Sequence, residues 1–157
     1  MAGLINKIKG LVKNRTTYRV GLLQAKAYRL LKVRTGEVLS KYNITTIDWA
    51  LLGLLNDNKD GIKSSSLAQE LGVEAPFITA LFAKLNKLDL VQSNPLPNDN
   101  RVKIITLTDK GFAFVESTES IVRNHMRPLL SGVPMKDVLA YVSVLEKMIE
   151  NSNKEEN

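Results

Sequence analysis

The sequence predicts a mainly α-helical fold of the α+β class, with one small β-hairpin set among several helices. Apolar residues recur at spacings of three and four over most of the 157-residue chain, which is the period of an amphipathic helix. The period becomes extended only in two short segments rich in β-branched residues, 90–92 and 102–107. This length suits one core and is too short for two ordinary domains, so we expect a single domain over 1–157.

Cysteine and histidine usage bounds the chemistry of the chain. The sequence has no cysteine and a single histidine, His125. It therefore excludes a disulfide framework and thiolate chemistry, and it argues against a zinc site. It offers no Ser-His-Asp set and no glycine-rich phosphate loop, so we expect no enzyme, no cofactor and no metal. No apolar run approaches the roughly 18–20 residues of a membrane span, and no secretory signal is recognisable, which predicts a cytoplasmic protein without a membrane partner.

Two helices are predicted in the first third of the chain. The longer runs from about 18 to 41, with pairs of apolar residues at helical spacing. The next begins near Thr45, and Asp48 three residues later resembles the partner residue of a capping box. The polar segment 56–61 ends this helix, since its composition is that of a turn.

A close pair of shorter helices follows. The serines at 64–66 can cap the first helix, and Gly72 ends it, as glycine commonly does just past a helix. The second helix covers 75–88, with Pro76 in its first turn and an apolar stripe at spacings of three and four.

The hairpin and two long helices complete the chain. The polar loop 93–100 joins the two strands and is stiffened by two prolines. Helices are then predicted over 108–130 and 135–152, before a frayed tail at 153–157. Three helices followed by a two-stranded wing is the order of a winged helix-turn-helix module.

The single domain divides by role. Residues 45–107 form the winged helix-turn-helix module. The apolar arcs on the flanking helices are wider than one small module can cover, which predicts a partner chain and an intertwined homodimer. The dimerisation helices fall within 1–44 and 108–152.

Basic charge is concentrated at the start of the chain. Residues 1–36 hold nine basic side chains and no acidic one, whereas the other 121 residues hold 13 basic and 16 acidic side chains. The net charge of +6 is therefore weak evidence for a nucleic-acid partner. The basic segment 1–16 has three interpretations: packing in a dimer interface, approach to a DNA backbone, or binding to an anionic membrane surface.

The module carries two motifs that point to a known family. The first, Leu67-Ala-Gln-Glu-Leu-Gly-Val73 with Pro76 and Leu90-Val91, resembles the helix-turn-helix of the MarR family of bacterial regulators. The second, Asp99-Asn-Arg101 followed by Leu107-Thr-Asp-Lys-Gly111, is similar to the wing of that family and to the start of the next helix. The resemblance covers nearly the whole chain after residue 17. It implies a homodimer on a pseudo-palindromic double-stranded DNA site, with a cleft for a small aromatic effector.

Three positions depart from the family pattern. Phe77 stands where a polar residue, often threonine, is common, and both Ala80 and Ser93 stand where arginine is frequent. The predicted recognition helix 75–88 consequently contains no arginine.

The wing and the recognition helix supply the candidate DNA contacts. The Arg101 guanidinium can enter a minor groove or fork onto a phosphate, with Asp99 holding it; the alternative is a solvated surface pair. Lys84 and Lys87 lie off the buried stripe and can reach phosphates or guanine edges. The full predicted DNA-binding set is Lys63, Ser64, Ser65, Ser66, Pro76, Phe77, Thr79, Ala80, Lys84, Lys87, Asp99, Arg101 and Lys103.

Several of these residues also have a structural interpretation. Phe77 can contact a thymine methyl or pack inward beside Phe82. Lys63 and the serines that follow can bind a phosphate oxygen or simply cap their helix. Trp49 suits core packing, although the family resemblance also makes it a candidate effector contact.

These observations predict a dimeric, sequence-specific transcriptional regulator, a repressor released by a small-molecule effector. The alternative is a winged-helix module that binds proteins or acts as a scaffold, with weak or no specific DNA binding. The arginine-free recognition helix and the mildly acidic winged segment favour this alternative.

Overall fold

The computed structural model describes residues 16–96 and 99–155, with side chains described over 18–95 and 103–154. Residues 1–15 of the basic segment 1–16, for which the sequence left three interpretations, therefore lie outside the described residues. The described chain divides into two compact units, one ending at His125 and one beginning at Met126.

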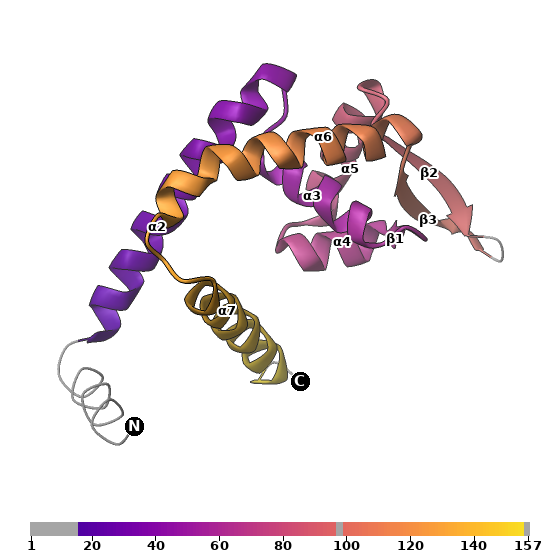
Figure 1. Ribbon diagram of the computed structural model, residues 1–157. Helices are drawn as coiled ribbons and strands as arrows, with labels where there is room; N and C mark the ends of the chain where they lie inside the picture. Colours follow the sequence, from indigo (N-terminus) through magenta and orange to yellow (C-terminus); the bar gives the residue numbers. More distant parts are fainter. Residues whose placement is uncertain (1–15, 97–98, 156–157) are drawn as a thin grey trace. The chain divides into compact units, whose positions relative to one another are not determined.

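The first unit contains the predicted order of four helices, a hairpin and one further helix (Figure 1). Its elements are α2 (Thr16–Leu39), the 3-10 turn η1 (Ser40–Tyr42), α3 (Thr46–Asp57), β1 (Ile62–Lys63), α4 (Ser64–Leu71), α5 (Ala75–Lys87), β2 (Val91–Leu96), β3 (Asp99–Leu107) and α6 (Asp109–Met126). The second unit holds the 3-10 turn η2 (Arg127–Leu130) and α7 (Met135–Glu155).

Leucine and isoleucine side chains from α3, α4, α5 and the sheet form the core of the first unit. Their spacing of three and four along each helix turns one stripe inward. The fully or almost fully buried apolar residues of these elements include Leu51, Leu52, Leu55, Leu67, Ile78, Leu85, Val91, Ile105 and Leu107.

The sheet has one strand more than the sequence predicted. All pairs are antiparallel in the order β1-β3-β2, and the two-residue strand β1 pairs Ile62 with Ile105. Gly61 precedes β1 with φ +85°, and a Cβ there would lie 2.5 Å from Ile104 Cγ2. Only glycine fits this turn without strain, because its φ is positive and the neighbouring strand leaves no room for a side chain.

The hairpin strands are also longer than predicted. β2 continues to Leu96 and β3 begins at Asp99, so most of the predicted loop 93–100 is paired strand. The register shifts between Pro95 and Leu96, which indicates a bulge or irregularity near the tip. Pro95 lies within β2 and did not end it.

The start of α6 is fixed against the end of α5. Thr108 caps the helix, since the Gly111 N–H donates to Thr108 Oγ1 at 3.0 Å. The same hydroxyl donates to the Asp89 carbonyl at 2.7 Å. A Cβ at Gly111 would lie 2.1 Å from the Leu90 carbonyl oxygen, so glycine permits this close backbone approach. The Leu107–Gly111 motif therefore has a structural role.

Other predicted helix boundaries need small corrections. Extended Lys63 is the N-cap of α4, and no side chain of the described residues caps that helix, so the predicted capping by serine is wrong. The reason is that β1 pairs with β3 up to Lys63, which places the serines inside the first turn. The helix predicted over 108–130 becomes 3-10 after Met126, and α7 continues to Glu155, into the tail predicted to fray.

The helices α2 and α7 each expose a broad set of apolar side chains. On α2 these are Tyr18, Val20, Leu22, Leu23, Tyr28, Leu30, Leu31 and Val33. On α7 they are Met135, Leu139, Tyr141, Val142, Val144, Met148 and Ile149. The opposite side of α7 is charged: Lys147 and Lys154 both donate to Glu150, and these bonds lower the pKa of that carboxyl.

None of the described helices is by itself long and apolar enough to cross a membrane. The segments Asp109–Leu130 and Met135–Lys154 pass that test only as a bent pair, on length and composition.

Candidate nucleic-acid interface

The recognition helix α5 presents one polar and small-residue face to solvent. Ile78, Leu81 and Leu85 are buried, as the apolar stripe predicted. The exposed positions of α5 are Ala75, Pro76, Phe77, Thr79, Ala80, Ala83, Asn86 and Lys87. Phe77 is 44% exposed, so the interpretation that it packs inward is wrong. An exposed face of short side chains lets a helix backbone approach a groove closely, with Lys87 and Thr79 as its polar groups.

A small hollow beside this face gathers hydroxyl groups and one ammonium group. It has a volume of about 90 Å³ and is lined by Ser64, Thr79, Phe82, Ser93, Lys103 and Ile105. The sequence predicted three of these as DNA contacts, in separate segments. The pairing of β1 with β3 brings the start of α4 to the wing strands. Hydroxyl and ammonium donors on adjacent elements suit a phosphate oxygen.

Ser93 is a residue whose role the sequence did not reveal. It was noted only as a departure from the arginine of the family pattern. In the sheet it stands opposite Ile105 of β3 and lines the hollow. The signal that could have revealed it is the register of the hairpin. The sequence predicted that the first strand ends at residue 92, which left Ser93 in the loop.

The remaining predicted residues of the α4 start and the wing lie as follows. Lys63 and Ser65 are exposed, whereas Ser66 is half-buried. Asp99 and Arg101 belong to the first residues of β3, and their side chains lie outside the described residues.

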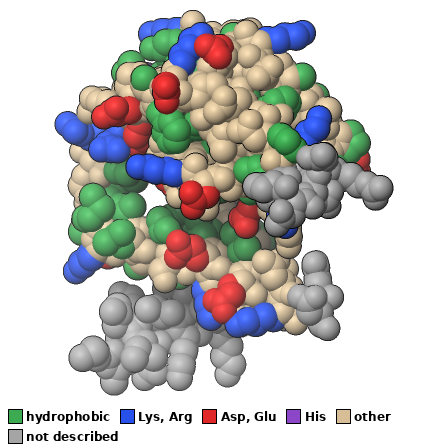
Figure 2. All heavy atoms as spheres, turned by 90° about the vertical axis from the view of Figure 1, so that its right-hand side faces the viewer, with side chains coloured by type: hydrophobic (Ala, Val, Ile, Leu, Met, Phe, Trp, Pro, Cys, Tyr) green, Lys and Arg blue, Asp and Glu red, His purple; other side chains and the backbone are tan. Residues whose placement is uncertain are grey.

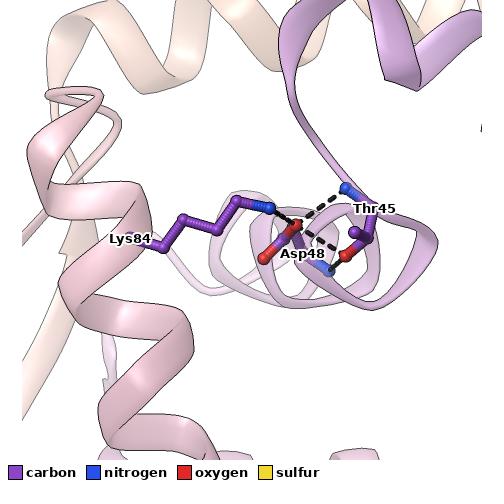
Figure 3. A network of polar contacts seen from close by, with 3 residues as sticks. All are labelled: Thr45, Asp48 and Lys84. Carbon is purple, nitrogen blue, oxygen red and sulfur yellow. Dashed lines mark hydrogen bonds and ion pairs between the residues drawn. The ribbon is translucent and has the colours of Figure 1, made fainter.

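Lys84 has a partner within the chain, which the sequence did not predict. Its ammonium donates to Asp48 Oδ2, which also accepts from the Thr45 N–H at 2.7 Å and the Thr45 hydroxyl at 2.6 Å (Figure 3). The Asp48 N–H donates back to Thr45 Oγ1, so the predicted capping box is confirmed. Asp48 is fully buried, while the Lys84 side chain is 33% exposed. Lys84 thus neutralises a buried carboxylate.

Trp49 lines a wide hollow between α2, α3 and the end of α4. The hollow has a volume of about 420 Å³, and its walls include Tyr28, Leu31, Lys32 and Leu71. The Trp49 ring also meets Phe114 of α6 edge-on, at a centroid distance of 6.3 Å. Trp49 therefore combines partial packing with exposure to a mainly apolar cleft.

Charge on the wing side is mixed. Figure 2 shows lysine and arginine side chains interspersed with acidic and apolar ones. Residues 37–157 carry a formal balance of −3, so long-range attraction of DNA by this part of the chain is weak. Any DNA contact here depends on a few placed donors.

The exposed α5 face, the sheet wing and the surrounding helices define a winged helix-turn-helix protein. No protein-family model matches the chain. It is similar to the HTH-type transcriptional regulator TcaR of Staphylococcus aureus, with 29% identity over 113 residues, 70% of this chain and 73% of TcaR. It is also similar to an HTH-type regulator of Bacillus subtilis, YdgJ, with 27% identity over 94 residues, 60% of this chain and 57% of YdgJ. The match thus spans little more than half of YdgJ.

Solved structures extend the likeness to the whole fold. A MarR-family regulator from Rhodococcus sp. RHA1 gives a TM-score of 0.78 at 18% identity, covering 87% of this chain and 96% of that chain. The MepR–DNA complex of S. aureus gives a TM-score of 0.70 at 24% identity, covering 83% of this chain and 96% of that chain. NadR in complex with 4-hydroxyphenylacetate gives a TM-score of 0.73 at 23% identity, covering 87% of this chain and 94% of that chain. The predicted resemblance to the MarR family is confirmed: the chain has the fold of these regulators, and its sequence relatives are transcriptional regulators.

Proposed function

We propose that the protein is a dimeric, sequence-specific DNA-binding regulator that acts in the cytoplasm as a repressor. The observation that carries this proposal is the exposed face of α5 beside the hollow of Ser64, Thr79, Ser93 and Lys103. Donors from α4, β2 and β3 line this hollow together with the Thr79 hydroxyl of α5, which donates to the Ala75 carbonyl at 3.3 Å. Relatives that are named transcriptional regulators, and a solved homologous fold in complex with DNA, support the same function.

We propose the same roles for the parts of the chain as the sequence predicted. Residues 45–107 bind DNA, and the helices within 1–44 and 108–152 form the dimer. The apolar faces of α2 and α7 support this, because seven or more large side chains on each helix are exposed in the single chain. A two-fold dimer would place two α5 helices in successive major grooves, about 34 Å apart.

The proposed DNA contacts are those predicted, with Ser93 added and Lys84 removed. Thr79, Ala80 and Lys87 face the major groove. Lys63, the serines of the α4 start and Lys103 contact phosphates. Arg101, held by Asp99, contacts the adjacent minor groove. Lys84 is removed because its ammonium is committed to Asp48.

We further propose that a small aromatic effector binds in the hollow beside Trp49. Its mainly apolar lining and the neighbouring Tyr28 suit a planar ring. A ligand between α2 and α3 can favour a different separation of the two modules, and only one separation fits both half-sites. The 4-hydroxyphenylacetate complex of NadR, a similar fold, supports this class of ligand.

A second candidate function is a winged-helix module for protein interaction or scaffolding. The absence of arginine from α5 and the −3 balance of residues 37–157 favour it. These features weaken base reading and attraction of DNA without affecting the fold.

Selection of genomic fragments by the purified protein distinguishes the two functions. The enriched fragments are sequenced, and binding is measured by fluorescence anisotropy against scrambled duplexes of the same composition. A regulator is expected to enrich a pseudo-palindrome and to bind it at least about a thousandfold tighter than the scrambled duplex. Equal affinity for both duplexes would favour the scaffold function.

A further inference from the structure

The ion pair between Asp48 and Lys84 joins α3 and α5, two helices that both pack on α4. Among the described residues, α5 packs most closely on α4 and β2, whereas α3 packs on α2, α4 and β3. Lys84 extends from α5 to the first turn of α3, where Asp48 lies (Figure 3). Within the described part of the chain, this side chain makes the direct polar link between α3 and α5.

The link continues from α3 toward α2. Asp48 Oδ2 accepts from both the backbone and the hydroxyl of Thr45, the N-cap of α3. The residue before it, Ile44, is buried, and its N–H donates to the Leu39 carbonyl at the end of α2 at 3.2 Å. One chain of hydrogen bonds thus runs from the end of α2, through the start of α3, to the recognition helix.

Asp48 and Lys84 both line the wall of a hollow. This hollow, of about 550 Å³, has walls from α2 (Tyr28 and Lys32), from the start of α3, and from α5 (Phe77 and Leu81). Where helices face one another across a hollow, few side chains pack between them. Such helices can shift unless another contact holds them in place. A buried carboxylate strongly disfavours losing its cation, so Asp48 and Lys84 make such a tie.

We propose that Asp48 is a positioning residue that acts through Lys84 to fix the setting of α5 relative to the end of α2. This inference rests on the proposed function, since α2 is a proposed dimerisation helix. In a dimer the tie would set the separation of the two α5 helices and hence the preference for two correctly spaced half-sites. Lys84 then acts as an anchor rather than as a phosphate contact.

The test compares binding to a full site and to a half-site. The probes are a duplex selected by the wild-type protein from a random-sequence library, and the same duplex with one half scrambled. The principal variant is Asp48→Asn with Lys84→Met, because removing both charges leaves no unpaired ion in the interior. Asp48→Asn alone serves if the double variant does not fold, because it leaves no buried carboxylate and the Lys84 side chain, 33% exposed, can reach solvent. Lys84→Met alone keeps the bonds between Thr45 and Asp48 but leaves that carboxylate without its cation.

Two further variants control for charge and for pairing. Lys136→Met removes a charge at an exposed position of α7, outside the proposed DNA contacts, and should leave the full-site to half-site ratio unchanged. Lys84→Arg keeps the cation and is expected to preserve the wild-type preference. Folding is checked by circular dichroism and thermal denaturation.

We expect the full-site to half-site affinity ratio of the double variant to fall at least about tenfold, with half-site affinity changed less than about threefold. The salt dependence should match that of the wild type, because an anchor releases no counterions from DNA. The single variants should each give most of the loss, and their effects should not add, as expected for one coupled pair.

Other results would overturn the inference. An unchanged ratio in a folded double variant would show that the pair does not set the spacing. A salt slope reduced by about 0.9 in Lys84→Met, with Asp48→Asn unchanged, would make Lys84 a phosphate contact instead. If the wild-type protein selects no duplex, the proposed function fails first, and that failure is seen before any variant is measured.

Discussion

Single cations near the wing carry the electrostatic part of the proposed binding, because the surrounding surface is not strongly basic. Lys103 is exposed on β3 and lines the hydroxyl hollow. Lysine acts on a phosphate as a point charge, so its position matters more than its orientation. Its loss should weaken all DNA binding alike.

Replacing Lys103 with methionine is therefore expected to reduce the salt slope of binding by about 0.9, the value for one phosphate contact. Affinity for specific and scrambled duplexes should fall by similar factors in fluorescence anisotropy titrations at several salt concentrations. Lys136→Met on α7 is the control and should leave the slope unchanged. A Lys103 variant that loses affinity for one sequence only would instead indicate base reading.

The wing arginine is expected to matter more than any lysine. Arg101→Ala should weaken binding to all DNA by roughly 1–3 kcal/mol with a shallower salt slope, since a guanidinium can make a bidentate contact. Arg123→Ala on α6 is a matched control, because Arg123 is already paired with Glu119 at 3.1 Å. Unchanged affinity at two salt concentrations would remove Arg101 from the mechanism.

At the level of elements, the corner between α5, β2 and α6 depends on one close backbone contact. Gly111→Ala should destabilise the fold by about 1–3 kcal/mol, because its Cβ would meet the Leu90 carbonyl oxygen and the backbone would have to shift. Thermal or urea denaturation measures the change.

Gly53→Ala in α3 is the matched glycine control. No atom lies within 4 Å of the Cβ position at Gly53, and alanine favours a helix interior by about 0.5–1 kcal/mol. This variant should be as stable as the wild type or more so. Equal destabilisation by both alanines would mean that the close approach at Gly111 is not what requires glycine.

The same elements show which features the sequence could predict. The helices, their apolar stripes and the capping box of Thr45 and Asp48 depend on neighbours within one turn, so local spacing reveals them. Strand β1 has only two residues. It forms by pairing with β3, where the partner of Ile62 is Ile105, 43 positions further along the chain. Its extended conformation moved the N-cap of α4 to Lys63. No local pattern carries that information.

The candidate site divides in the same way. Exposure of Thr79, Ala80 and Lys87 followed from helical periodicity. Lys84 did not, because its partner Asp48 lies 36 residues away, and a lysine off the buried stripe was read as free. Ser93 joined the site through sheet register, which a hydrophobic pattern near a proline-containing tip does not specify.

At the scale of the whole molecule, the exposed apolar faces of α2 and α7 support the proposed dimer. Leu139 and Ile149 of α7 are 62% and 63% exposed in the single chain. Replacing both with glutamate should convert the dimer to monomers in analytical ultracentrifugation, because charges in an apolar interface are costly without partners. Full-site DNA affinity should fall with it.

The control for this prediction is Ser143→Glu, which adds a charge to α7 away from the apolar stripe. It should leave the oligomeric state unchanged. A Leu139 and Ile149 double variant that remains dimeric would place the interface elsewhere on the molecule.

The short strand β1 affects which elements can move separately when such a protein releases DNA. Because β1 hydrogen-bonds to the outer edge of β3 and runs directly into α4, the base of the wing is tied to the start of α4 along that edge. Movement of the hairpin base would therefore displace the serines at the start of α4. We therefore expect α4 and the base of the wing to move together when DNA is released.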